Sequence, residues 1–360
     1  YEILASLEFR RVLFRSVDWV VADSIRGSWR EKQGWPVFEA ESINLIVSPP
    51  PERVATLLQE RKDQSLHIFT GIHAEEFMRA TFLSAVRSGC RCGLLNEYQP
   101  PQGRFGFAKR LVHTAYRMMF GKHIFALFCI GMRSVDWYRK VGYPESKLVN
   151  WMYTPQPPVP PRRDLWPDAK VPHIMFLSTL SETKGADLFV DALLELGDLE
   201  WKASLIGEGP LAEELHAKIA ASPLRDRFET GKFRPYAEAM ALLATADLAV
   251  VPSRHDGWGT IVSEALRLGV PVIASKNCGA SDVLREAWRG TVIPEASVPA
   301  LAAALREWIP RLPLPPEERE RIFAWSDRLS GETAAGHFLA SLDAISAGEP
   351  PPTPPWMTPS

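Results

Sequence analysis

A proline-rich run divides this chain into two parts that show the same pattern. Residues 155–172 (PQPPVPPRRDLWPDAKVP) hold seven prolines, and proline disfavours the interior of both helices and strands. On either side, short apolar runs alternate with longer amphipathic stretches, which is typical of a mainly parallel sheet covered by helices. The sequence therefore predicts an α/β protein with two Rossmann-like domains that face each other across a cleft.

The expected boundaries follow from the same pattern. The chain has 360 residues, which exceeds the roughly 250–300 residues that a single core usually reaches. The tail is rich in proline and cannot bury enough apolar surface to order itself. The expected segments are a first domain at 17–154, a linker at 155–172, a second domain with C-terminal helices at 173–345 and a disordered tail at 346–360.

The first residues look unlike the rest of the chain. Residues 7–16 (LEFRRVLFRS) resemble a translated sequencing-adapter remnant, so residues 1–16 carry no functional argument. On this interpretation the first domain lacks its first strand, and we expect it to be incomplete.

Charge and cysteine content narrow the class of protein. The net charge of −2 gives no general attraction for nucleic acid. The four cysteines are too scattered for a disulfide framework and lack the second cluster of a zinc site, so they fit a structural role in a reducing cytoplasm. No apolar run reaches the roughly 18 residues of a membrane span. We expect a cytoplasmic protein that binds no nucleic acid.

Two loops in the second half carry residues that suit a phosphorylated ligand. After the expected strand Ile174–Leu177, Lys184 begins a helix, where its ammonium can neutralise a phosphate held by helix amides. After the expected strand Ala203–Ile206, Gly207 and Gly209 let the backbone approach a ligand closely. Taken alone, each loop is better explained as an ordinary turn, because lysines and glycines are common in loops.

A third loop combines several such residues. The expected strand Leu248–Pro252 leads into residues 253–260, and a helix then carries Glu264. The first turn of that helix offers unpaired N–H groups to a diphosphate. Glu264 can accept hydrogen bonds from both hydroxyls of a ribose, and Asp256 lies on the loop nearer to an attached sugar. Either carboxylate alone would fit a local cap or a solvated side chain, but the whole string favours a nucleotide-sugar site.

These residues resemble the GT-B glycosyltransferases, specifically glycosyltransferase family 4. The family pattern P-S-x-x-E-G-F-G-x-x-x-x-E-A-x-x-x-G-x-P-V-I-A is met by Pro252–Gly259, Glu264-Ala265, Gly269 and Pro271–Ala274. Lys184-Gly185 and Gly207–Pro210 match two further family elements in the same order. The resemblance covers most of residues 173–345 by motif and residues 17–154 by layout.

The resemblance implies a role for each residue. Lys184 would neutralise the diphosphate, Glu264 would hold the donor ribose, and Asp256 would contact a hydroxyl of the transferred sugar. Stabilising the departing nucleoside diphosphate is the main electrostatic task of this chemistry. The other expected donor-binding residues are Gly207, Gly209, Gly257, Trp258, Gly259 and Thr260. Members of the family retain the anomeric configuration and need no bound metal or cofactor, the nucleotide-sugar being the donor substrate.

Three residues depart from the family pattern. Asp256 is one methylene shorter than the usual glutamate, Trp258 replaces phenylalanine, and Thr179 stands where an arginine is often found. Lys184 therefore lacks its usual guanidinium partner, for which the nearby Arg254 is a candidate substitute. The departure at Asp256 leaves the transferred sugar open.

The first half offers two candidates for contact with the donor sugar or the acceptor. His73 follows the expected strand Leu66–Thr70, and Glu97 follows the expected strand Cys92–Leu95, where relatives often carry a histidine. The alternative, that both side chains only form local hydrogen bonds, has at least equal weight.

Residues 104–123 (RFGFAKRLVHTAYRMMFGKH) form a basic amphipathic stretch without an acidic residue. Such a helix can lie on an anionic membrane surface. A core-facing helix with a solvated basic face explains the pattern equally well. Membrane contact would suit an acceptor carried by a lipid, with the protein held at the inner face of the membrane.

The sequence predicts a retaining glycosyltransferase that moves a sugar from a nucleotide-diphosphate donor to a glycan or lipid-linked acceptor, in bacterial cell-surface polysaccharide synthesis. Three alternatives share the architecture. A nucleotide-sugar epimerase is one, and a glycan phosphorylase is another, although no signature for its pyridoxal phosphate is visible. The third is a degenerate protein that binds the donor without turnover, which the departures at Thr179 and Asp256 keep open.

Overall fold

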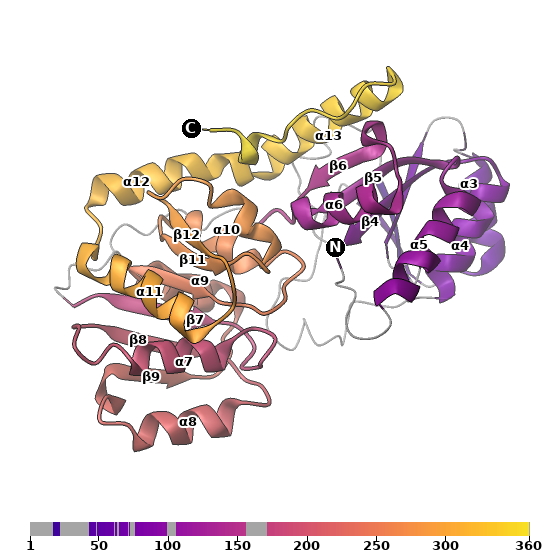
Figure 1. Ribbon diagram of the computed structural model, residues 1–360. Coiled ribbons are helices and arrows are strands. Elements are labelled where there is room, and N and C mark those ends of the chain that lie inside the picture. Colours follow the sequence, from indigo (N-terminus) through magenta and orange to yellow (C-terminus); the bar gives the residue numbers. More distant parts are fainter. Residues whose placement is uncertain are drawn as a thin grey trace. The chain divides into compact units, whose positions relative to one another are not determined.

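The computed structural model describes residues 17–21, 43–47, 49–60, 62, 65–70, 72, 76–98, 106–155 and 171–359. These residues form two compact units. The described parts of 17–153, together with 331–355, make up the first unit, and 154–155, 171–330 and 356–359 make up the second. Each unit is built on a parallel sheet (Figure 1), so the predicted α/β class is confirmed.

The first unit has a four-stranded parallel sheet in the order β3-β4-β5-β6. Its strands are β3 (Leu66–Thr70), β4 (Arg91–Glu97), β5 (Ile124–Ile130) and β6 (Leu148–Trp151). Two further strands, β1 (Val17–Val21) and β2 (Ile43–Val47), pair in parallel with each other. The unit's helices are α3 (Pro51–Glu60), α4 (Glu76–Arg87), α5 (Gly106–Phe120), α6 (Gly131–Val141), the 3-10 turn η2 (Glu145–Lys147) and α13 (Gly331–Ser346).

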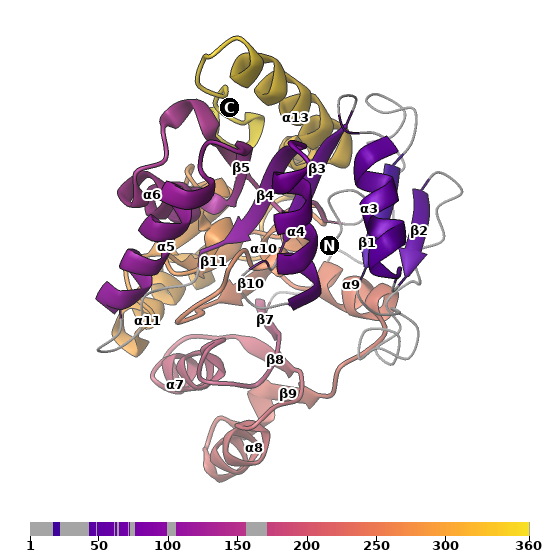
Figure 2. The same cartoon turned by 90° about the vertical axis from the view of Figure 1, so that its right-hand side faces the viewer.

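Strand β5 shows how the sheet is covered on both faces. Successive side chains of a strand point to opposite faces. Leu127 and Cys129 belong to the apolar cluster that includes side chains of α3, α4 and α6. Phe128 stacks instead on Phe338 of α13, with ring centroids 5.0 Å apart. Figure 2 shows α4 lying across β3 and β4.

The second unit has a six-stranded sheet in the order β12-β11-β10-β7-β8-β9, and every pair in it is parallel. Its strands are β7 (His173–Leu177), β8 (Lys202–Ile206), β9 (Phe228–Gly231), β10 (Leu248–Val251), β11 (Val272–Ser275) and β12 (Gly290–Ile293). Strands β8 and β9 are added on one side of β7, and strands β10, β11 and β12 are then added on its other side. The strand order therefore reverses between β7 and β10.

Helices connect these strands in the expected alternation. They are α7 (Ala186–Leu194), α8 (Ala212–Ala221), α9 (Tyr236–Ala244), α10 (Thr260–Leu266), α11 (Val298–Trp308) and α12 (Pro316–Trp325), with 3-10 turns η4 (Arg225–Arg227), η5 (Gly279–Val283) and η6 (Ile309–Arg311). On α12, buried Arg319 donates to the carbonyls of Ala244 and Ala246 at 3.2 and 3.1 Å. These bonds fix α12 against the end of α9.

Two 3-10 turns interrupt the helices in the second half of the chain. After β11 the chain forms the turn η5, where Gly279 N and Ala280 N donate to the carbonyls of Asp256 and Trp258 in the loop after β10, at 3.2 and 2.7 Å. Of the C-terminal helices expected within 173–345, α12 and α13 are separated by the 3-10 turn η7 (Ser326–Leu329), and α13 belongs to the first unit instead of the second.

The tail that we expected to be disordered has defined structure. Residues 355–357 form a 3-10 turn, η8 (Pro355–Met357), and the side chain of Trp356 is fully buried. Arg328 donates to the carbonyl and the hydroxyl of Thr358 at 2.9 and 3.1 Å. A single tryptophan buries more apolar area than any other side chain, so composition alone understated what the tail could bury.

Candidate functional site

The candidate donor residues lie in loops at the carboxyl ends of the second unit's strands. Lys184 follows β7, Gly207 and Gly209 follow β8, and Asp256 follows β10. Ligands of parallel α/β sheets bind outside the carboxyl ends of the strands, at the point where the strand order reverses. In this sheet that point lies between β7 and β10, whose loops carry Lys184 and Asp256.

Backbone hydrogen bonds join four neighbouring loops at this edge. The loop after β8 bonds to the loop after β7, since Leu180 N donates to Glu208 O at 3.0 Å. Arg254 N donates to Thr183 O at 2.9 Å and so connects the loop after β10 with the loop after β7. Asp256 N donates to Asn277 O at 3.1 Å, which adds the loop after β11. A site preorganised in this way needs little rearrangement to stabilise developing charge.

Two glycines allow the loops to approach this closely. Gly185 has φ +73°, and a Cβ there would lie 2.4 Å from the carbonyl oxygen of Pro252. Gly259 has φ +86°, and a Cβ there would lie 2.4 Å from Cys278 Sγ. Both backbone conformations are left-handed, which residues with a Cβ rarely adopt. Any larger residue would push the loop of Lys184 or that of Asp256 out of position.

The structure brings together two of the predicted residues, Lys184 and Asp256. Lys184 Nζ donates to Asp256 Oδ2 at 2.7 Å, and their side chains are 30% and 14% exposed. The spacing of the two residues along the chain gives no indication of this ion pair. The cation expected at the diphosphate and the carboxylate expected at the sugar thus lie next to each other.

Arg254 does not take the place of the missing arginine at Thr179. Its guanidinium forms two hydrogen bonds with the carboxylate of Asp187 on α7, at 2.7 and 2.6 Å, and a third with Glu182 O at 2.7 Å. The hydrogen bond to Asp187 raises the pKa of Arg254 above its usual value. Arg254 therefore fastens the loop after β10 to α7. No motif in the sequence singles out Asp187, because it lies inside a helix and not in a loop.

Glu264 is buried in α10, where 8% of its surface is exposed, and it lies one turn beyond Thr260 at the start of the helix. Trp258 differs from the simplest expectation. Its indole is buried and donates to Ser263 Oγ at 3.2 Å, and its carbonyl accepts from Ala280 N at 2.7 Å. Trp258 therefore packs under the loop, and contact with a donor would come from its backbone.

The loop after β11 is a part of the site that the sequence analysis missed. Residues Asp256 and Cys278 form an isolated parallel bridge, and Gly279 N donates to Asp256 O at 3.2 Å. A Cβ at Gly279 would lie 2.1 Å from Gly257 O. The signal was Gly279 itself, which allows this close approach. Burial raises the pKa of Cys278 strongly, so its thiol stays protonated.

His73 and Glu97, the candidates for acceptor contact in the first unit, stay predictions. Glu97 is the last residue of β4 rather than part of the following loop, and it is exposed. His73 lies outside the described residues, as do residues 104 and 105 of the basic stretch. Within the described ranges, no group of three or more His, Cys, Asp or Glu side chains could hold a metal ion. No described helix is long and apolar enough to cross a membrane.

Comparison with known families adds to this geometry. Residues 162–322 match the family model described as glycosyl transferases group 1. The matched segment contains all of the candidate donor residues, from Lys184 to Glu264.

Relatives that match part of the chain include glycosyltransferases of bacteria. Alpha-D-kanosaminyltransferase of Streptomyces kanamyceticus is 26% identical over 153 residues, which are 42% of this chain and 39% of that protein. A GDP-mannose-dependent alpha-(1-6)-phosphatidylinositol dimannoside mannosyltransferase of Mycobacterium tuberculosis is 30% identical over 175 residues, 46% of this chain and 42% of that one. The chain thus spans less than half the length of these relatives.

Solved structures share the fold over a larger part of the chain. A glycosyltransferase from Rickettsia africae has a TM-score of 0.69 at 15% identity, covering 96% of this chain and 94% of its own. The Anabaena protein HepE in complex with UDP has a TM-score of 0.64 at 15% identity, covering 84% and 86%. The predicted GT-B fold class, with its two parallel α/β sheets, is confirmed.

Proposed function

We propose that this protein is a retaining glycosyltransferase that uses a nucleoside-diphosphate sugar as donor. The observation that carries the proposal is the ion pair of Lys184 and Asp256 at the reversal point of the second sheet, with Glu264 in the next helix. A cation and two carboxylates in these positions suit a diphosphate, a sugar hydroxyl and a ribose. The match to group 1 glycosyl transferases and the UDP and UDP-glucose complexes of the Anabaena neighbour support it.

In the proposed reaction the bond between the anomeric carbon and the diphosphate oxygen breaks, and a bond to the acceptor oxygen forms. Negative charge accumulates on the departing diphosphate, so a fixed cation there lowers the barrier. Lys184 would supply that charge, and the amides of residues 257–260 would add hydrogen bonds. Asp256 would accept a hydrogen bond from a hydroxyl of the sugar, and Glu264 from the ribose hydroxyls. His73 and Glu97 remain candidates for contact with the sugar or the acceptor, which we propose to be a glycan or a lipid-linked sugar of bacterial polysaccharide synthesis.

A protein that binds the donor without turnover is the second candidate. The same ion pair favours it, because Asp256 neutralises Lys184 and so weakens the charge that would stabilise a departing diphosphate. The two candidates differ only in whether nucleoside diphosphate is released.

The test is to incubate the full-length protein with a panel of nucleotide-sugars and to measure the release of nucleoside diphosphate. Lys184→Ala should lower the rate about 100- to 1,000-fold, which is the usual cost of removing one charge-stabilising donor. Lys218→Ala is the matched control, since Lys218 on α8 also pairs with an aspartate, Asp191, outside the site. Its rate should stay close to that of the parent. Binding without release would establish the second candidate, and neither binding nor release would refute both.

A further inference from the structure

Helix α5 of the first unit presents an apolar face to solvent. Leu111, Val112, Met118 and Met119 are 55%, 52%, 68% and 54% exposed. No other large hydrophobic residue in the described part of the chain is comparably exposed. Their spacing places the four on one side of the helix as two pairs seven positions apart, with Ala115 between them, and we call this set the stripe. Single exposed apolar residues are common, but four on one side of a helix mark an interaction surface.

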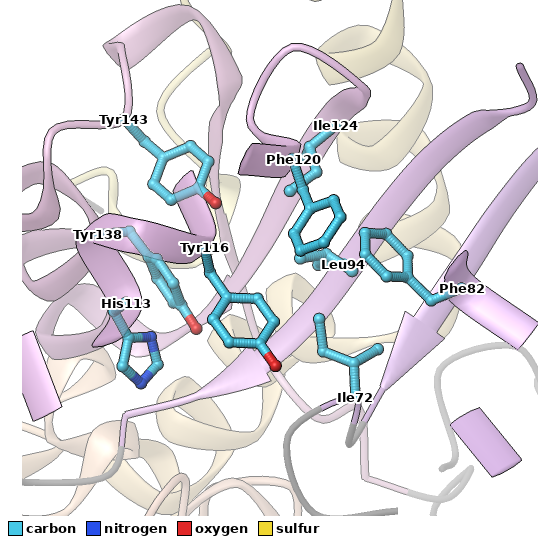
Figure 3. Close-up of a pocket in the computed structure, with 9 residues that line it drawn as sticks. All are labelled: Ile72, Phe82, Leu94, His113, Tyr116, Phe120, Ile124, Tyr138 and Tyr143. Atoms are coloured by element: carbon cyan, nitrogen blue, oxygen red, sulfur yellow. The ribbon is translucent and has the colours of Figure 1, made fainter. Parts of the chain in front are cut away.

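This stripe is not the face that packs on the core. The opposite side of α5 carries His113, Tyr116 and Phe120, which point into a small aromatic pocket together with Tyr138 and Tyr143 (Figure 3). Phe120 meets Phe82 of α4 edge to face, with centroids 5.6 Å apart. The helix is thus apolar on two sides, and the fold of the first unit uses one of them.

The cations of α5 lie on several sides of the helix. Lys122 follows Met118 by four positions and shares the side of the stripe, whereas Arg110 donates to Lys140 O at 3.2 Å. Residues 106–123 contain Lys109, Arg110, Arg117 and Lys122 and no acidic residue. At the end of the helix, a hollow of about 400 Å³ is lined by Arg117, Met118, Gly121, Lys122, Tyr143, Pro144 and Lys147. Met118 belongs to both the stripe and the wall of this hollow.

The groups in the hollow suit an oxyanion. Lys147 Nζ donates there to the carbonyls of Gly121 and Ile124 at 2.9 and 2.5 Å, which leaves its third hydrogen for a ligand. The Nε of Arg117 is buried and has no hydrogen-bond partner within the described part of the chain. The nearest acid along the chain, Glu145, forms hydrogen bonds with Arg139. The hollow therefore presents positive charge without a carboxylate among its lining residues.

We propose that α5 docks on an anionic phospholipid bilayer. The stripe of Leu111, Val112, Met118 and Met119 enters the interfacial region, and the phosphate of a lipid headgroup occupies the hollow between Arg117, Lys122 and Lys147. Basic amphipathic helices bind in this way, through buried apolar area and attraction to anionic lipids. The inference deepens the proposed function and rests on it in one respect, since a bilayer-bound transferase would meet a lipid-linked acceptor.

Charge favours a bilayer over a second copy of the chain as the occupant. A two-fold dimer through this face would place the same patch on both subunits. The cations of one copy would then lie against those of the other, and like charges in contact oppose association. An anionic lipid surface complements both the stripe and the cations of the hollow.

Vesicle flotation of the full-length protein tests the proposal. Vesicles of phosphatidylcholine mixed with phosphatidylglycerol should bind the protein, and vesicles of phosphatidylcholine alone should not. Added salt should weaken binding because it screens the cations. Met118→Gln/Met119→Gln should lower the partition coefficient about tenfold, because two apolar side chains no longer enter the interface.

Two charge variants separate the hollow from net charge. Arg117→Gln/Lys122→Gln should lower the partition coefficient by about tenfold or more. Lys202→Gln/Lys232→Gln removes the same charge from exposed positions of the second unit and should bind like the parent. Equal losses in both would mean that net charge, not this face, governs binding, and would overturn the proposal.

The remaining outcomes are equally distinct. A parent protein that ignores anionic vesicles, or a methionine variant that binds like the parent, would refute docking through α5. Light scattering that shows a dimer, lost in the methionine variant, would identify the face as an interface between copies. Nucleoside diphosphate release by the same variants without vesicles should match the parent. Vesicle binding without any release would contradict the proposed function and leave the docking surface standing.

Discussion

The carboxyl edge of the second sheet and the outer face of α5 are built on different principles. At the sheet edge, four loops bond to one another through their backbones, and glycines stand where two backbones meet. On α5 the backbone is an ordinary helix, and only the choice of side chains makes its outer face unusual. A site made by backbone packing tolerates few residue types at its contacts. A surface made only by side chains can change its residues with little effect on the stability of the fold.

The strongest test of this comparison is Gly185→Ala. Left-handed backbone strain and overpacking against Pro252 O should each cost about 1–3 kcal/mol of the free energy of unfolding. Activity should fall as well, because Lys184 is the neighbouring residue. Urea unfolding and release of nucleoside diphosphate measure the two effects.

Gly336→Ala is its matched control. Gly336 lies within α13, and a Cβ there would have no atom within 4 Å. Alanine should stabilise the helix by about 0.5–1 kcal/mol. If Gly185→Ala unfolded like the parent, the loops would not depend on close backbone contact.

The same contrast explains what the sequence could predict. Strand β3 has the predicted limits Leu66–Thr70, and β8 begins one residue before the predicted strand Ala203–Ile206, because apolar periodicity reports directly on strands. The Lys184–Asp256 pair was not predicted as a contact, since 72 positions separate the two residues and only the sheet order joins their loops. The hydrophobic residues of α5 could be identified from the sequence. The face of α5 that packs on the core could not, because it depends on the neighbouring helices.

The pH dependence of the free energy of unfolding should report on one buried titratable group in each unit. In the first unit, His337 of α13 bonds to Asn150 O through Nε2 at 3.1 Å, and burial lowers its pKa to about 4. In the unfolded chain the pKa of His337 is near 6.5, so below that pH the unfolded chain binds a proton that the folded state does not bind. The contribution of His337 to the free energy of unfolding is therefore fully present above about pH 6.5. It is lost as the pH drops toward 4, by up to about 3 kcal/mol.

Asp247, a buried carboxyl of the second unit, should contribute with the opposite sign. Burial raises the pKa of Asp247, so acid favours the folded state at this carboxyl. Urea unfolding of the parent and of His337→Gln at pH 7 and pH 5 checks the assignment. A pH dependence that persists unchanged in His337→Gln would show that another group causes it.

Asp256→Asn examines the ion pair at the sheet edge. Removing the carboxylate frees Lys184, and partly exposed ion pairs contribute up to about 1 kcal/mol. Nucleoside diphosphate should therefore bind up to about fivefold more tightly, while turnover falls because a neutral amide accepts the sugar's hydrogen bond more weakly than a carboxylate does. Calorimetric titration measures the affinity. Asp191→Asn, which breaks the pair with Lys218 instead, should change neither, and weaker binding in Asp256→Asn would mean that Asp256 orients Lys184 rather than competing for it.

The smallest effect should come from the outer face of α5. Met118→Gln/Met119→Gln should leave the free energy of unfolding within about 0.5 kcal/mol of the parent, because surface substitutions away from packed contacts rarely do more. On the inner face of the same helix, Phe120→Ala should cost about 3–5 kcal/mol, since it empties a site packed against Phe82. Two faces of one helix would then separate folding from docking. A methionine variant as unstable as Phe120→Ala would instead mean that the outer face is packed in the folded protein, and no bilayer would be needed to cover it.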